Sequence, residues 1–230
     1  MFSLLKNLLA PKESAPAPTS APVAGDMRDV LFGDLPLVRW TGDGQDEPWS
    51  QFARVQTLLR AGDKIGAIAV LRDVAGADGL EARHTLQAWH FLRELGEKPD
   101  APLAKEVLGV VVEVGLPEGL DVLAAYRDHS ARYWNWSGKG VVWERPDARM
   151  DASIDALLQA GATVVAHIGP WEGARPAAVV APMARLNFLT PSGLHFGQAA
   201  MNDLMRDPLA APAFEAAAGL MQQLTALAVP

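Results

Sequence analysis

The chain has 230 residues, of which 50% are hydrophobic, and it carries a formal net charge of −7 and no cysteine. This apolar fraction excludes disorder of the whole chain, and the acidic balance offers no basic field for phosphates, so we expect no nucleic-acid partner. Without cysteine, the chain can form no disulfide, thiol nucleophile, or Cys-based zinc or iron–sulfur site. No run reaches the roughly 18 apolar residues of a membrane-spanning helix, and no secretion signal is seen, so we expect a cytoplasmic protein.

The first ten residues have the pattern of an amphipathic helix, and Lys6 and Asn7 fall on its polar face. Residues 11–27 are rich in Pro and Ala and predict a disordered linker. A helix on such a tether is expected to dock on another protein or, weakly, on a membrane surface through residues 1–10. The alternative is that the helix folds back on its own domain. The expected docking residues are Phe2, Leu4, Leu5, Leu8 and Leu9.

Residues 28–230 are expected to form a single α+β globular domain that begins with a helical part, residues 48–96. Apolar stripes at helical spacing, a capping aspartate and terminal glycines mark its helices. The predicted helices cover residues 48–61, a stretch from Asp63 onward, and residues 80–95.

Two glycines give this helical part a repeat period. Gly62 and Gly96 each follow a helix and are 34 residues apart, which is the period of a tetratricopeptide repeat. The packing positions of that family around the first glycine correspond to Leu59, Ala67 and Leu71. Residues 48–96 therefore resemble one such repeat and the first helix of another, which implies a helical hairpin that binds peptides. The pattern departs from the family at Pro99 and Pro102.

Residues 107–198 are expected to be mainly sheet. Val110, Val112 and Val114 alternate with other residues as in a strand, and Pro117-Glu118-Gly119 predicts a three-residue hairpin loop. Three more strands are predicted after this loop, and an antiparallel meander is their simplest arrangement. The four predicted strands lie at about 110–114, 120–127, 130–137 and 140–145.

A second hairpin is expected after the meander, with Pro191-Ser192-Gly193 as another three-residue loop. Before it we predict a helix at residues 153–159 and an apolar strand at residues 163–168. The last part, residues 199–230, is expected to be helical. Its predicted helices lie at about 198–206 and 212–227.

The predicted register divides the meander into two faces, one of which has a cluster of tryptophans. The mainly aliphatic face is assigned to the core and comprises Val110, Val112, Val114, Val122, Ala124, Tyr126, Ala131, Tyr133, Asn135, Val142 and Glu144. On the opposite face, Trp134, Trp136 and Trp143 lie beside Arg132 and predict a binding surface for a peptide or a ring-shaped ligand. The alternative is that the helices of residues 48–96 simply cover these rings.

The second hairpin provides another candidate surface. With a three-residue loop, its apolar face would contain Leu186, Phe188, Leu194 and Phe196. Arg185, Asn187 and His195 would then point the other way and line a pocket.

No complete catalytic or metal-binding set is recognisable, and we expect no catalytic residue, metal or other cofactor. Glu81 and His84 have the spacing of a bundle metal site, but His84 continues an apolar stripe and is expected to be a structural histidine. His167 is expected to be a buried imidazole in its predicted strand, and His195 has no placed carboxylate.

The leading hypothesis is a non-enzymatic protein-interaction or adaptor protein with a tethered N-terminal docking helix. Its partner would be another protein, and the helix would place it in the cytoplasm, peripheral to a membrane where the helix contacts lipid. The alternative is a small-ligand sensor that uses the Trp-bearing sheet face. A third hypothesis is an unrecognised hydrolase centred on His195 or His167.

Overall fold

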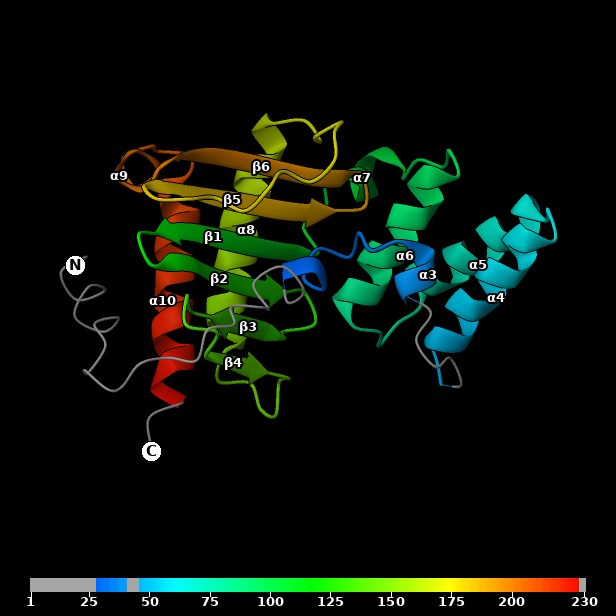
Figure 1. Cartoon of the computed structure of the whole chain (residues 1–230), viewed down its shortest axis with the longest axis horizontal. Coiled ribbons are helices and arrows are strands. Elements are labelled where there is room, and N and C mark those ends of the chain that lie inside the picture. The colour runs from blue at the N-terminus through cyan, green and yellow to red at the C-terminus, as the bar shows by residue number, and fades with distance from the viewer. Residues whose placement is uncertain (1–27, 41–45, 228–230) are drawn as a thin grey trace.

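The computed structural model describes residues 28–40 and 46–227 of the chain, and it confirms the predicted α+β class. A six-stranded antiparallel sheet has the strand order β4-β3-β2-β1-β5-β6. Helices α8 and α10 cross one face of this sheet, and α3 to α6 lie beyond one end of its strands (Figure 1). We call the face under α8 and α10 the back face and the opposite one the front face. The predicted N-terminal helix and linker lie outside the described residues.

The helical part contains the three expected long helices. Asp63 caps the second one by accepting a hydrogen bond from the Gly66 amide at 2.8 Å. Phe52, Val55 and Leu71 belong to a core that is separate from the one beneath the sheet and that also contains Leu35 and Trp40. Pro102 falls in a helix of only four residues. The helices are α3 (Leu37–Trp40), α4 (Trp49–Arg60), α5 (Lys64–Gly76), α6 (Ala82–Glu94) and α7 (Ala101–Ala104).

The predicted four-stranded meander is confirmed, and the second hairpin extends the same sheet because β5 pairs with β1. The meander strands are β1 (Gly109–Leu116), β2 (Gly119–Tyr126), β3 (Ala131–Trp134) and β4 (Gly140–Trp143). The hairpin strands are β5 (Met183–Thr190) and β6 (Gly193–Ala200).

The predicted register of both hairpins is wrong by one residue. Leu116 pairs with Gly119, and Thr190 pairs with Gly193, so each loop has two residues and each glycine already belongs to the returning strand. A shift of one residue moves every side chain of a strand to the opposite face. Val122, Ala124, Tyr126 and Val142 therefore do not share the face of Val110 and Val112, as predicted. That face instead carries Leu123, Ala125 and Trp143, together with Ala131 and Tyr133, which were predicted correctly.

The predicted strand at residues 163–168 is also wrong, because a single helix, α8 (Asp151–His167), continues through it. The β-branched run there favours a strand locally, but Val164 and Val165 continue the buried stripe of the helix. Gly161 brings the helix close to the sheet, since a Cβ added there would lie 2.9 Å from the Phe188 ring. Packing on the sheet therefore outweighs local propensity.

The last helices close the back face. Helix α10 (Ala211–Leu227) agrees with the prediction, whereas α9 (Met201–Leu204) begins later than expected because β6 extends to Ala200. Leu220 and Leu224 of α10 join Ile154 and Leu157 of α8 in the main core beneath the sheet. Among the described residues, no helix is both long and apolar enough to cross a membrane.

The front face is covered by the N-terminal segment, residues 28–36, together with the start of α6. Leu31, Phe32 and Leu86 pack on Val111 and Tyr126 there. Polar contacts fix the segment on both sides. The Tyr126 hydroxyl donates to the Leu31 carbonyl at 2.7 Å, and the Gln87 amide exchanges two hydrogen bonds with the Leu35 backbone at 2.7 and 3.0 Å. The segment therefore joins the sheet to the helical part.

Candidate functional site

The three tryptophans of the predicted binding surface do not share a face. Trp143 pairs with Ala131, lies on the back face and is 4% exposed in the main core. Trp134 lies on the front face and Trp136 in the β3–β4 turn, and both are half-buried. Arg132 is buried on the front face, where it pairs with Glu144 at 2.6 Å. The prediction of a shared Trp surface was therefore wrong, because β4 pairs with β3 in a different register from the one predicted.

Arg185 and Asn187 do come together on the front face, but around a buried carboxylate. Arg185 and Asn187 both donate to Oε2 of Glu113 at 3.1 Å, and Arg28 donates to Oε1 at 2.5 Å. All three partners of Glu113 are largely buried, and burial lowers the pKa of Arg185. Arg28 also donates to the Pro176 carbonyl at 2.8 Å. This network fixes the N-terminal segment and residues 170–182 to the sheet.

His195 is not part of that surface, because it pairs with Phe188 and lies on the back face. Its ring is fully buried, and burial lowers its pKa. Nδ1 is 3.5 Å from the Thr190 hydroxyl, and that hydroxyl is 2.9 Å from the Ser192 hydroxyl. Among the described residues, no carboxylate contacts His195, so these groups do not form a nucleophile, base and acid in line.

The other predicted histidines have separate roles. His84 is buried, as expected of a structural histidine, with its ring 5.0 Å from the ring of Trp49 and 5.8 Å from that of Trp40. Burial lowers its pKa. His167 is exposed at the end of α8 rather than buried in a strand. Within the part of the chain that the structure describes, no group of three His, Cys, Asp or Glu residues is placed to hold a metal ion.

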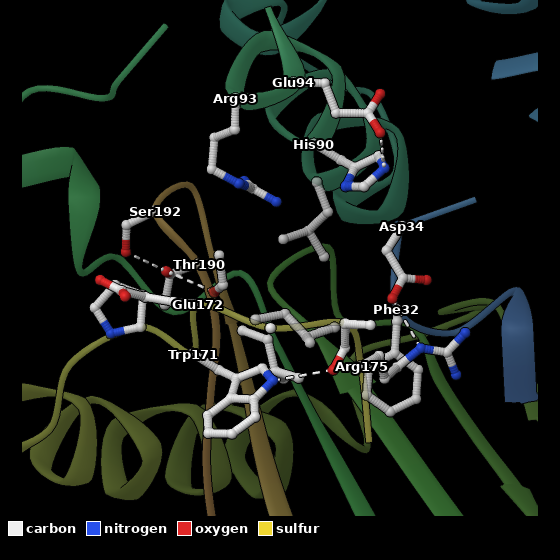
Figure 2. Close-up of a pocket in the computed structure, with 18 of the residues that line it drawn as sticks. Phe32, Asp34, His90, Arg93, Glu94, Trp171, Glu172, Arg175, Thr190 and Ser192 are labelled. Atoms are coloured by element: carbon white, nitrogen blue, oxygen red, sulfur yellow. Dashed lines mark hydrogen bonds and ion pairs between the residues drawn. The ribbon is translucent and has the colours of Figure 1, made fainter. Parts of the chain in front are cut away.

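The candidate site is a cleft of about 650 Å³ between the helical part and the tip of the β5–β6 hairpin. Four segments far apart in the sequence form its walls: the N-terminal segment, the C-terminal half of α6, residues 170–175 and the hairpin tip (Figure 2). Its charged, aromatic and hydroxyl-bearing lining residues include Phe32, Asp34, His90, Arg93, Glu94, Trp171, Glu172, Arg175 and Ser192. None of these nine was a predicted site residue.

One wall of the cleft is an ion-paired layer around Arg175. Its guanidinium donates to Asp34 at 2.8 Å and to Asp29 at 2.7 Å, and this contact lowers the pKa of Asp29. The same guanidinium lies over the Phe32 ring, 4.4 Å from its centre. The charge of Arg175 is thus balanced by carboxylates of the protein itself.

Arg93, on the opposite wall, is bound differently. One of its terminal nitrogens donates to the Pro191 carbonyl at 2.7 Å, and burial lowers its pKa to about 10. Among the described residues, it forms no ion pair with a carboxylate. The neighbouring His90 is 3.4 Å from Glu94, and burial lowers the pKa of His90.

Trp171 forms the rim of the cleft and is 49% exposed. Its backbone N–H donates to the Leu194 carbonyl at 2.6 Å, and its indole N–H donates to the Ala174 carbonyl at 3.0 Å. The ring meets the Phe196 ring edge-on at 5.3 Å between centres. These contacts fix the orientation of the indole while leaving about half of it open to solvent.

Comparison with protein-family models, with curated proteins and with solved structures gives no match for this chain. The resemblance to tetratricopeptide repeats therefore stays a prediction.

Proposed function

We propose that this protein is a non-enzymatic interaction protein, and that the cleft between α6 and the β5–β6 tip receives a segment of another protein. The observation that carries the proposal is the half-exposed, fixed ring of Trp171 at the rim of a large cleft. Tryptophan is enriched at binding hot spots because its ring provides a large contact area with little loss of conformational entropy. A rigid indole therefore supports recognition at this place.

The chemistry of the surroundings supports binding rather than catalysis. Thr190 and Ser192, two hydroxyl-bearing residues of the cleft lining, do not line up with His195 as a nucleophile and its base, and His90, a histidine of the lining, is 3.4 Å from Glu94. The cleft also joins the sheet to the helical part. Clefts at such junctions are common sites for ligands and partners.

Site-specific photo-crosslinking in cells tests the proposal. A photo-reactive phenylalanine analogue at position 171 should give protein adducts, whereas the same analogue at position 65 should give none. Ile65 is a suitable control because it is the more exposed of the two, at 84%, and lies on α5 away from the cleft. Equal adducts at both positions, or no protein adduct at position 171, would contradict the proposal.

The second candidate function is a small-ligand sensor, now placed at the cleft rather than at the predicted Trp face. The volume of about 650 Å³ favours it, because small-molecule sites occupy about 300–1,000 Å³. A metabolite that raises the unfolding temperature of the wild type but not of Trp171→Ala would support this function. Protein adducts at position 171 together with no such metabolite would exclude it.

The tethered N-terminal helix, with its peripheral membrane or partner docking, belongs to the same proposal. Phe2, Leu4, Leu5, Leu8 and Leu9 lie outside the described residues, so only sequence supports this part. In this scheme the helix brings the protein to its place in the cytoplasm, and the cleft selects the partner.

A further inference from the structure

Three guanidinium groups near Arg93, those of Arg28, Arg175 and Arg185, are matched to carboxylates of the protein. Arg28 and Arg185 share Glu113, and Arg175 holds Asp29 and Asp34. Arg93 differs from all three, because its hydrogen bond goes to the neutral Pro191 carbonyl. In a chain with a net charge of −7, a partly buried cation without an ion-pair partner among the described residues is unusual.

The geometry leaves most of the Arg93 donors available to a ligand. A guanidinium has about five N–H donors in a planar fork, and Pro191 takes only one of them. Figure 2 shows Arg93 extending from α6 into the cleft, on the wall opposite Trp171 and Arg175. Burial has removed part of the water from this cation. Asp34 and Glu94 compensate for this loss only through charge interactions at a distance. An incoming anion would complete that compensation.

The charges of the cleft limit what kind of anion it can accept. Asp34, Glu94 and Glu172 also line the walls, so the surroundings of Arg93 are acidic rather than basic. A phosphate with nearly two negative charges would be repelled more strongly than a carboxylate with one. A carboxylate also matches the planar guanidinium fork with two parallel hydrogen bonds.

We propose that the cleft recognises a single carboxylate of the partner protein, held by Arg93 next to an apolar side chain that packs on Trp171. This inference rests on the proposed function and deepens it by naming the chemistry of the partner segment. The carboxylate is either a Glu or Asp side chain or the C-terminus of the partner chain, and the experiment separates these sources.

The test begins with a library of random dodecapeptides, selected for binding to the full-length protein. The selected peptides are then synthesised in four forms: the parent, the C-terminal amide, a form with Glu and Asp replaced by Gln and Asn, and a form with phosphoserine at the acidic positions. Fluorescence polarisation gives each dissociation constant. We expect the wild type to lose about 10-fold or more in affinity when the essential carboxylate is neutralised, either in the amide or in the amidated side chains.

Variants then link this carboxylate to Arg93. Arg93→Gln should weaken the parent peptide about 10-fold or more, and neutralising the peptide should cost that variant nothing further. Arg93→Lys, which keeps the charge but loses the fork, should fall between the wild type and Arg93→Gln. The exposed Arg72 pairs with Glu97, and neither residue lines the cleft, so Arg72→Gln should bind as the wild type does. Unchanged urea midpoints establish that the variants fold.

The outcomes separate this inference from the function on which it rests. Peptides that bind equally well when neutralised, or that bind Arg93→Gln as tightly as the wild type, would overturn the carboxylate inference. If Trp171→Ala still abolished their binding, the cleft would remain the interaction site. Tighter binding of the phosphoserine form would also overturn the inference. Failure to select any peptide would count against both proposals.

Discussion

Glu113 provides the sharpest test of how the fold is held together, because a single carboxylate neutralises two buried guanidinium groups. Its side chain is fully buried, and those of Arg28 and Arg185 are 10% and 4% exposed. Glu113→Ala leaves both cations buried without a carboxylate partner, and breaking a buried pair costs about 3–5 kcal/mol. We therefore expect the free energy of unfolding to fall by about that amount.

Urea unfolding followed by circular dichroism measures this loss. With a slope of about 1–3 kcal/mol per molar urea, a loss of about 3 kcal/mol moves the midpoint down by about 1–3 M. Glu106 is a suitable control, because its ion pair with Arg127 is at the surface, with side chains that are 36% and 52% exposed. Glu106→Ala should cost less than about 1 kcal/mol. A loss below about 1 kcal/mol for Glu113→Ala would refute the reasoning.

Three further predictions concern a glycine, a histidine and the N-terminus. Gly161→Ala should lower the free energy of unfolding by about 1 kcal/mol, because its new Cβ overlaps the sheet. Gly219→Ala, in open space on α10, should raise it by about the same amount. Urea midpoints measure both changes, and a rise in the midpoint of both variants would contradict the packing argument. Burial lowers the pKa of His84, so the unfolded chain takes up a proton at this residue more readily than the folded one. The free energy of unfolding should therefore have its full value above about pH 6.5 and decline as the pH falls below it. The urea midpoint should decline less with falling pH in His84→Gln than in the exposed control His167→Gln. Equal declines in the two variants would refute the assignment of this pH dependence to His84. Deletion of residues 1–25 should change the localisation of the protein in cell fractions, and unchanged localisation would remove the docking helix from the proposal.

Local signals in the sequence were sufficient for the long helices α4, α5, α6 and α10 and for the existence of both hairpins, but not for the second half of α8, which was predicted as a strand. Asp63 is a side-chain cap, and such caps act within one turn of chain, so the start of α5 can be predicted without the rest of the fold. The exact register depends on whether a loop has two or three residues, and Pro-x-Gly sequences are compatible with both. That ambiguity placed His195 among the wrong neighbours. Trp143 was placed on the wrong face for a different reason, because the β3–β4 loop spans residues 135–139 rather than the two residues predicted.

The cleft could not be predicted, because it depends on long-range assembly. Arg93 on α6, Trp171 in a connecting segment and Phe32 near the N-terminus meet only when the helical part, the hairpin tip and the N-terminal segment pack together. One partial signal was present in the sequence. Trp171 falls within a Gly- and Pro-rich stretch, residues 169–182, where a large aromatic residue has no regular strand or helix to pack into.

The attachment of the N-terminal segment has a mechanical consequence. Arg28, at the start of the described chain, is held to the centre of the sheet by its ion pair with Glu113. A pulling force on residues 1–27 would therefore load the β1–β5 ladder and the walls of the cleft first. If the start of the chain is held at a membrane or on a partner, tension along it would reach the binding cleft before it reached α8, α10 or the rest of the main core.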